Sequence, residues 1–196
     1  MIDRRRLALL APLAAISLSA CGVNAIPTGQ ENVKAKWAQV ENQYQRRADL
    51  IPNLVATVKG YAKHEQSTLE GVTQARARAT SINVSADDLQ DPAKLQQYSQ
   101  AQGQLSAALG RLLSVQENYP DLKADQNFLA LQSQLEGTEN RIAVARNDYN
   151  QAVQQYNTMI RTFPDVIGAK IIYGAKPMTP YHATTPGAET APKVSF

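Results

Sequence analysis

The sequence predicts an all-α protein, an elongated antiparallel helical bundle of about four long helices followed by a flexible C-terminal tail. Apolar residues recur every three or four positions over most of the chain, which is the spacing of one buried face of a helix. Short polar turns separate these stretches, and long amphipathic helices joined by short turns pack as an up-and-down bundle. No strand pattern appears before the tail. With 43% apolar residues, 196 residues suffice for one domain with a real core.

The first 20 residues have the shape of a secretory signal. Arg4, Arg5 and Arg6 form a charged end, and an apolar run of about a dozen residues follows, shorter than the ~20 that a membrane span needs. Cys21, the only cysteine, follows the tripeptide LSA, and these four residues resemble a bacterial lipobox, in which the cysteine is acylated. We therefore predict a lipoprotein signal peptide over residues 1–20 and lipidation at Cys21. An incidental free thiol is the alternative.

This leader sets the expected location of the protein. Residues 21–30 would form a lipid-anchored tether, and several acyl chains on Cys21 would hold the chain stably at a membrane. We expect an exported, periplasm-facing bacterial lipoprotein. Gly22, where Asp would retain a lipoprotein at the inner membrane, favours the outer membrane if the host has two membranes.

Net charge gives little sign of a nucleic-acid partner. The whole chain carries +3, but residues 1–20 contribute three arginines and one aspartate, which leaves the remainder at +1. No basic stripe of the kind that nucleic-acid binding needs is present. We predict no nucleic acid among the partners, and a single cysteine allows no internal disulfide.

The first helix is expected over residues 31–47 and the second over residues 50–80. Pro52 divides them, because a proline costs little in the first turn of a helix but about 3 kcal/mol in its interior. Asp49 is a suitable cap just before it. One long helix kinked at Pro52 is the alternative. The apolar stripe on the first half comprises Val33, Trp37, Val40, Tyr44, Ala48 and Ile51, and the second stripe restarts as Leu54, Val58, Tyr61, Leu69 and Val72.

The third helix is expected from Pro92 to about residue 118, after a loop over residues 84–91. Asp91 and Pro92 are a strong start signal, a capping residue followed by proline at the first helical position. The fourth helix is expected over residues 122–161 with a near-heptad stripe, typical of coiled-coil packing. The two stripes comprise Leu95, Tyr98, Leu105, Leu109 and Leu112, and then Leu131, Leu135, Thr138, Ile142, Ala145, Tyr149, Ala152, Tyr156 and Ile160.

Phe163 and Pro164 are expected to stop the fourth helix. A short piece over residues 165–173 would dock back through Val166, Ile167 and Ile171, which completes a bundle domain over residues 31–173. From Gly174 to residue 196 the chain is dominated by Pro, Thr, Ala and Gly, which predicts a flexible tail.

Motifs for catalysis are weak. His64 and Glu65 begin like the zinc motif HExxH, but position 68 is Thr and the other histidine, His182, lies in the tail. We predict no metal site and no cofactor, and Glu65 as a partly buried, paired acid. Asp87, Asp88 and Asp91 lack calcium-loop spacing and are expected to cap helices. No GxSxG elbow or glycine-rich phosphate loop is present.

One group of polar residues could carry function. We define the polar cluster as eight side chains that flank the stripes of the first and fourth helices. An interhelical network of ion pairs and amides, which fixes register, is the expected role. A ligand- or partner-binding patch and a catalytic site are the alternatives. Tyrosines at the stripe edges would mark either the core edge or a partner groove. The polar cluster comprises Glu41, Asn42, Arg46, Asp49, Glu139, Asn140, Arg141 and Arg146.

Residues 37–65, WAQVENQYQRRADLIPNLVATVKGYAKHE, resemble the N-terminal signature of the LemA family. Residues 119–157 are similar to that family's C-terminal signature, and FP at 163–164 and PKVSF at 192–196 to its tail. The resemblance implies a helical, envelope-located protein without a settled molecular role. Family members usually begin with an uncleaved spanning helix, which this chain replaces with the lipobox.

These observations together predict a non-enzymatic, lipid-anchored scaffold or adaptor for an unidentified envelope protein. The alternatives are a ligand-binding or hydrolytic enzyme that uses the polar cluster, and a membrane-shaping protein. Assembly into a homo-oligomer is left open.

Overall fold

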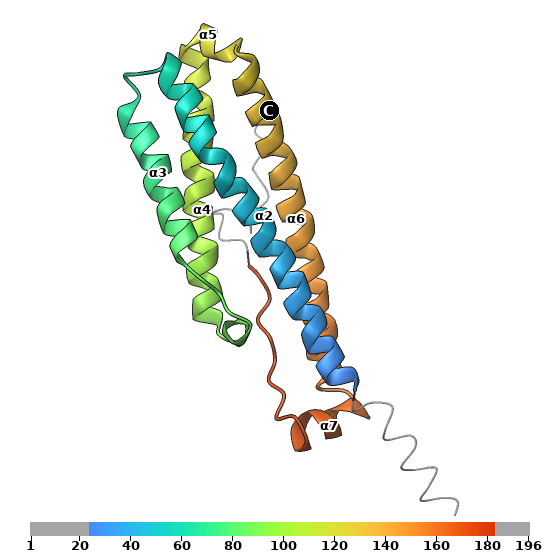
Figure 1. Cartoon of the computed structure of the whole chain (residues 1–196). Helices are drawn as coiled ribbons and strands as arrows, with labels where there is room; N and C mark the ends of the chain where they lie inside the picture. Colours follow the sequence, from blue (N-terminus) through green and yellow to red (C-terminus); the bar gives the residue numbers. More distant parts are fainter. Residues whose placement is uncertain (1–23, 183–196) are drawn as a thin grey trace, which may run out of the picture.

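The computed structural model describes residues 24–182, and all structural statements concern this part of the chain. These residues form helices and no strands, which confirms the all-α prediction (Figure 1). In chain order the elements are α2 (Ala25–Tyr61), α3 (Gln66–Ser81), the 3-10 helix η1 (Asp87–Gln90), α4 (Pro92–Ser114), the 3-10 helix η2 (Val115–Asn118), α5 (Pro120–Lys123), α6 (Gln126–Met159) and α7 (Asp165–Ile171).

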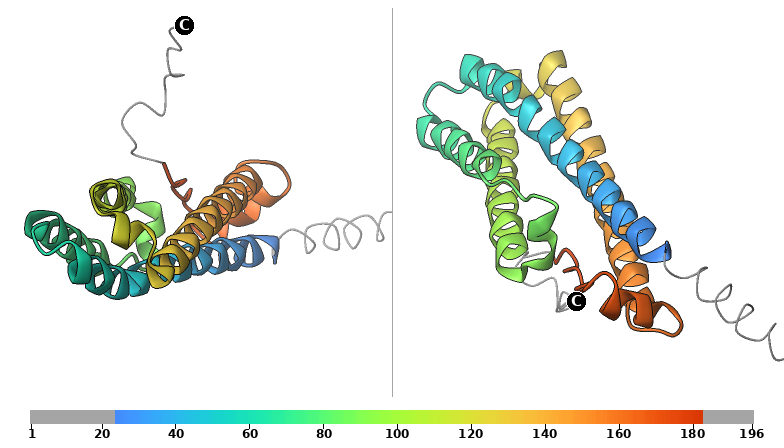
Figure 2. Two further views of the ribbon diagram at one scale, coloured as in Figure 1. Left: turned by 90° about the horizontal axis from the view of Figure 1, so that it is seen from above. Right: turned by 60° about the horizontal axis from the view of Figure 1, so that its bottom comes forward.

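The helices form an elongated antiparallel rod built from two pairs. The long helix α2 packs along α6, while α3 packs along α4, and α2 also contacts α3. The helices α4 and α6 form no comparable pairing, and two further views show them diverging on one side of α2 (Figure 2). The bundle is therefore open along that side rather than closed in a square.

The predicted division at Pro52 was wrong and the alternative of one long helix is confirmed, because α2 runs without interruption from Ala25 to Tyr61. The chain breaks instead between Tyr61 and Gln66, inside the predicted second helix. Pro52 lies on the exposed face, and a proline there leaves the carbonyl of Ala48 without its intrahelical donor. Arg76 of α3 replaces that donor, since its Nε lies 2.7 Å from Ala48 O. The buried stripe also continues through this region with steps of four and three: Val33, Trp37, Val40, Tyr44, Arg47, Ile51, Leu54 and Val58.

Aspartates set the starts of two helices. Asp91 caps α4, and its Oδ1 accepts a hydrogen bond from Ala93 N at 2.9 Å, as the sequence predicted. The helix α6 begins at Gln126 and not at residue 122, because Asp125 caps it and accepts from Phe128 N at 2.8 Å. The one-turn helix α5 occupies the residues before that cap.

Two clusters of buried side chains form the core. The first cluster surrounds the N-terminal half of α2 and is rich in aromatic rings, among them Trp37, Tyr98 and Tyr149. The other cluster is mostly aliphatic and lies between α2, α3, α4 and the start of α6. The predicted stripes of α4 and α6 are buried, with Leu131 partly so.

The flexible tail predicted from Gly174 onward requires a correction over its first nine residues. Residues 174–182, which we call the strap, run back along the bundle, and Met178 and Tyr181 are buried in the aromatic cluster. The strap is polar or small at most positions, so its sequence carries no helical or strand pattern, yet hydrogen bonds from α6 hold it. Residues 183–196 lie outside the described residues.

The short helix α7 docks onto the bundle in the opposite orientation from the one predicted. Its small residues Gly168 and Ala169 are buried and Val166 is half-buried, whereas Ile167 and Ile171 are exposed. The docking was predicted correctly, but the face was not.

The predicted leader and lipidation site lie outside the described residues, so Cys21 stays a prediction. None of the described helices combines the length and the apolar character that crossing a membrane requires.

Candidate functional site

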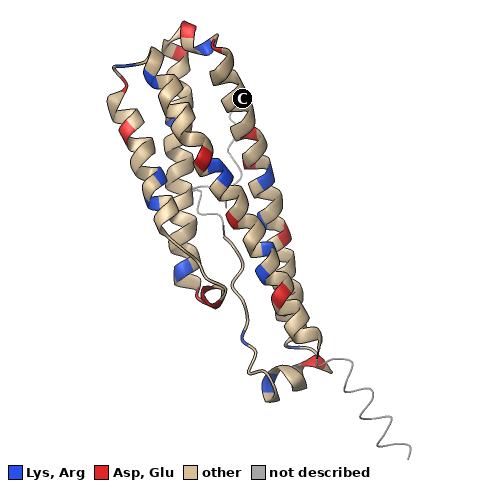
Figure 3. Ribbon diagram, viewed as in Figure 1, with Lys and Arg blue, Asp and Glu red and all other residues tan. Residues whose placement is uncertain are grey.

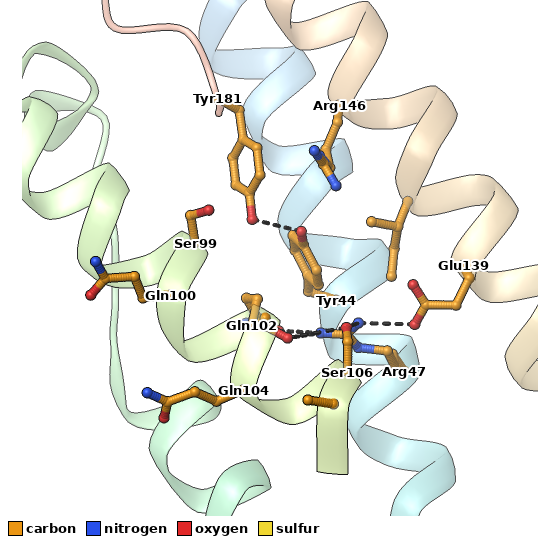
Figure 4. Close-up of a pocket in the computed structure, with 13 residues that line it drawn as sticks. Tyr44, Arg47, Ser99, Gln100, Gln102, Gln104, Ser106, Glu139, Arg146 and Tyr181 are labelled. Carbon is orange, nitrogen blue, oxygen red and sulfur yellow. Dashed lines mark hydrogen bonds and ion pairs between the residues drawn. The ribbon is translucent and has the colours of Figure 1, made fainter. Parts of the chain in front are cut away.

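The open side of the bundle contains a groove of about 540 Å³ (Figure 4). It lies where α4 and α6 diverge over α2, and the strap closes one end of it with Tyr181. Most of its lining residues carry polar side chains, and they come from four segments of the chain. The lining residues are Tyr44, Arg47, Ser99, Gln100, Gln102, Gly103, Gln104, Ser106, Ala107, Glu139, Ile142, Arg146 and Tyr181.

Arg47 forms the floor of the groove and joins three helices. Its side chain is 1% exposed, and its Nη1 donates to Glu139 Oε1 of α6 at 2.9 Å and to Ser106 Oγ of α4 at 2.8 Å. Its Nη2 donates to Oε1 of Gln102 at 2.6 Å. The guanidinium also lies 4.9 Å from the centre of the Tyr44 ring. Because Glu139 is 46% exposed, the pair is buried on the arginine side and open to water on the other.

Arg146 is the second cation of the groove and is less fully paired. Its guanidinium stacks over the Tyr181 ring at 4.6 Å, a cation–π contact. Within the described residues no carboxylate forms an ion pair with it, and Nε of both Arg47 and Arg146 is buried without a hydrogen-bond partner. Two arginines against one glutamate leave the groove with positive charge.

Aromatic rings from four segments form the wall beneath Arg146. The hydroxyls of Tyr44 and Tyr181 lie 2.7 Å apart and share a hydrogen bond. Trp37 contacts Tyr98 and Tyr149 edge to face, with ring centres 5.5 and 5.2 Å apart. Burial, reinforced by the neighbouring Tyr181, raises the pKa of Tyr44 far above its usual range, so this hydroxyl stays neutral and acts as a structural contact.

Two asparagines one heptad apart on α6 hold the strap. Asn150 Nδ2 donates to Tyr181 O at 3.0 Å while its Oδ1 accepts from Tyr181 N at 2.7 Å. Asn157 repeats this pairing with Met178, at 2.7 and 2.8 Å. Each side-chain amide thus pairs with the backbone of one strap residue as a neighbouring strand would, which explains why a segment without its own secondary structure is held in place.

The structure separates the eight residues of the polar cluster. Glu139 and Arg146 line the groove, whereas Glu41 and Asn42 line a smaller hollow of about 260 Å³ beside α3 and the following loop. Burial raises the pKa of Glu41.

The remaining four residues of the polar cluster lie on the surface. Arg141 donates to Gln43 Oε1 at 3.3 Å and to Thr138 Oγ1 at 2.9 Å along the seam of α2 and α6. Arg46, Asn140 and Asp49 are exposed, the last accepting from Gln45 at 2.7 Å. An interhelical network does exist, but Arg47 carries it in place of Arg46.

Most groove residues are missing from the predicted polar cluster, among them Arg47, Gln102, Ser106 and Tyr181. Arg47 had a signal, because it occupies a heptad position of the buried stripe seven residues after Val40. Gln102, Ser106 and Tyr181 had no such signal in the sequence, because a polar residue on a helix or tail becomes a groove residue only through the packing of other segments.

The chemistry of the groove favours binding over catalysis. Its lining contains one carboxylate and neither histidine nor cysteine. Within residues 24–182, no group of three or more metal-ligating side chains comes together. His64 lies in the turn between α2 and α3, and Glu65 accepts from Tyr119 Oη at 3.4 Å, a half-buried acid as predicted. Asp88 accepts from Ser85 N and Oγ at 2.8 Å, so it stabilises the turn before η1.

Comparison with known proteins identifies similar chains. The model of the LemA family matches residues 36–196. Magnetosome protein MamQ 1 of Paramagnetospirillum magneticum is 27% identical over 174 residues, covering 81% of this chain and 64% of that protein. Protein LemA of Metamycoplasma hominis is 26% identical over 140 residues, covering 71% and 60%. The chain therefore spans less than two thirds of the length of these relatives.

Proposed function

Because the chain belongs to the LemA family, which is not a known family of enzymes, we propose that it is a non-enzymatic, lipid-anchored scaffold or adaptor of the bacterial cell envelope. The observation that carries this proposal is the open, positively charged groove part-way along a rigid rod. Such a groove offers a partner protein a fixed binding place at a set height above the anchor.

The height follows from helix geometry. Arg47 lies 22 residues after Ala25 in an unbroken α2, which at about 1.5 Å per residue places the groove some 33 Å from the start of the helix. Cys21 precedes Ala25 by four residues, and a chain spans at most about 3.6 Å per residue, so the lipid would be attached within about 14 Å of the rod. The protein would face the periplasm, from the outer membrane if the host has two membranes.

The groove suits an extended, acidic segment of the partner. Arg146 supplies a cation that no acid of the described residues neutralises, and a carboxylate from the partner would pair with it. Gln100 and Gln104 on the α4 wall offer amides for backbone groups of an extended chain. The binding mode would repeat what Asn150 and Asn157 already do for the strap.

Photo-crosslinking in cells tests the adaptor role. A crosslinking amino acid at Gln104, in the groove, should capture one or more envelope proteins that mass spectrometry can identify. The matched control is Val144, which is 63% exposed on α6 and outside the groove lining. Equal capture at both positions, or none at Gln104, would contradict the proposal.

Charge reversal sharpens the same experiment. Arg146→Glu should abolish capture at Gln104, because it replaces the spare cation by an acid. Arg111→Glu makes the same charge change at an exposed position of α4 outside the groove and should leave capture unchanged. Loss of capture in both variants would point to net charge and not to the groove.

Fatty-acid labelling tests the anchor separately. Cys21→Ser should abolish incorporation of a labelled fatty acid and either leave the precursor uncleaved or release the protein from membranes. Labelling of the serine variant as strong as that of the wild type would exclude lipidation at this position.

A small-molecule ligand is the second candidate, favoured by the partly open shape of the groove and its spare arginine. Small dicarboxylates would then raise the melting temperature of the wild type but not of Arg146→Gln. Because its lining contains only one carboxylate, the groove gives no support for a hydrolytic enzyme.

A further inference from the structure

We propose that the α7 end of the rod contacts the phospholipid surface directly, as a second membrane contact beside the lipid anchor. The contact surface, which we call the α7 patch, consists of five exposed apolar side chains: Phe163, Ile167, Ile171, Ile172 and Tyr173. This inference rests on the anchoring proposed above, because it needs a membrane at this end of the molecule.

The α7 patch concentrates apolar exposure in one place. Eight large apolar residues are exposed in the described part of the chain, and five of them fall within eleven consecutive positions. Phe163 is 81% exposed and Ile171 is 79% exposed. Isolated exposed apolar residues are ordinary, but a contiguous group marks a surface that another apolar phase covers.

The way α7 docks explains this exposure. Gly168 and Ala169 are buried against the aromatic cluster, which includes Ile26 at the start of α2, and Ala169 O accepts from Ala175 N at 2.8 Å. The small residues thus face the protein, while Ile167 and Ile171, one turn apart, face outward. If this end of the rod faced only water, the opposite arrangement would be more stable, because burying an isoleucine side chain is favourable.

The α7 patch lies at the end of the rod where α2 begins. The helix α7 contacts α2, and Figure 1 shows it beside the first turn of α2. Only three residues separate Cys21 from Ala25. A lipid on Cys21 would therefore bring the bilayer to α7 and to no other exposed apolar group of the described chain.

Charge at this end suits an anionic membrane surface. Lys170 of α7 is exposed, as are Arg161 and Lys176, which lie within five residues of α7 along the chain, and α7 itself contains one acid, Asp165. Figure 3 shows basic ribbon segments at this end of the rod. Basic residues beside an apolar face are typical of interfacial helices, because each is attracted to anionic headgroups. A phospholipid bilayer therefore matches both the apolar and the charged features of the surface.

Fluorescence on the full-length lipoprotein tests the proposal. An environment-sensitive dye is attached at Ile171→Cys, and the protein is reconstituted in vesicles of equal parts phosphatidylglycerol and phosphatidylethanolamine, with or without lipids that carry a quenching nitroxide. The dye should shift to the blue and lose fluorescence to the nitroxide lipid, as expected about 5–10 Å below the headgroups. Both sites of labelling, here and in the control, are exposed, so the substitutions remove no core packing.

The control is the same dye at Val144→Cys on α6, which should show neither change. Co-flotation with the vesicles reports anchoring independently. Flotation without quenching at Ile171 would overturn the α7 contact and leave the anchor intact, whereas loss of flotation in all variants would overturn the anchor itself. A blue shift without quenching would mean that protein, such as a second copy of the chain, covers the patch, which also overturns the proposal.

Discussion

The two halves of the rod are packed by different chemistry, and they meet at Arg47. The half beyond Arg47 is filled mostly by leucine, valine and alanine from α2, α3, α4 and the start of α6. The half nearer α7 is filled by tryptophan and tyrosine rings, and it depends on the strap, which lies more than 130 residues from Tyr44 along the chain. The aliphatic half thus draws on helices alone, whereas the aromatic half is complete only when the end of the described chain returns to it.

This difference places the groove at the boundary. Aliphatic side chains interlock without polar atoms, but each tyrosine hydroxyl needs a partner, and the strap supplies several of them. Tyr149 Oη donates to Thr179 O at 2.8 Å, and Ser99 Oγ donates to His182 O at 2.7 Å. The polar surface that results continues into the groove.

The largest expected effect is the loss of stability of the aromatic half at alkaline pH. Burial raises the pKa of Tyr44, Tyr98 and Tyr149 well above the usual value. Their contribution to stability is then complete below the unfolded-state pKa of about 10 and is lost as pH rises above it, by about 1.4 kcal/mol per pH unit for each, or about 4 for three. Urea unfolding as a function of pH measures this slope. Tyr98→Phe should reduce the slope by about a third, and an unchanged slope would contradict the assignment.

The second largest expected effect is the loss of stability on removal of the Tyr181 ring. Tyr181→Ala deletes a buried aromatic side chain, which typically costs about 3–5 kcal/mol. Because the strap serves only one half, hydrogen exchange should rise in the strap and in the adjoining parts of α2 and α6, while α3 keeps its protection. His182→Ala is the control, since that residue is exposed and contributes only its backbone carbonyl. An equal rise of hydrogen exchange in both halves would contradict the view that the strap stabilises only the aromatic half.

At the boundary between the two halves, substitutions of two neighbouring arginines should differ sharply in their effect on the free energy of unfolding. Arg47→Ala should lower the free energy of unfolding by about 2–4 kcal/mol, because it strands polar groups on α4 and α6. Arg46→Ala, one position earlier and exposed, should change it by no more than about 0.5 kcal/mol. Urea denaturation of the two variants decides the point, and similar losses would mean that the buried network does not join the halves.

The smallest expected change in stability concerns the contact that accommodates Pro52 in the aliphatic half. Arg76→Leu should cost about 1–3 kcal/mol by leaving Ala48 O without a donor. In a Pro52→Ala background the restored N–H can serve that carbonyl, so the same substitution should cost less. A double-mutant cycle measures the coupling. Arg78→Leu, exposed on α3, serves as the control, and additive effects would show that Arg76 does not compensate for the proline.

The sequence by itself determined the helical class, the buried stripes of α4 and α6, and the cap at Asp91, because hydrophobic spacing and capping act within a few residues. It also contained the evidence for a continuous α2, since the steps of four and three from Val33 to Val58 pass through Arg47. Pro52 outweighed that evidence because the donor that accommodates it, Arg76, belongs to another helix.

Only the tertiary structure decided which polar residues meet. Arg46 and Arg47 are adjacent and identical in type, and the rotation of α2 against its neighbours buries one and exposes the other. The same holds for the strap, whose order comes from Asn150 and Asn157 rather than from its own residues. Such contacts join segments far apart in the chain, so no local pattern of residues encodes them.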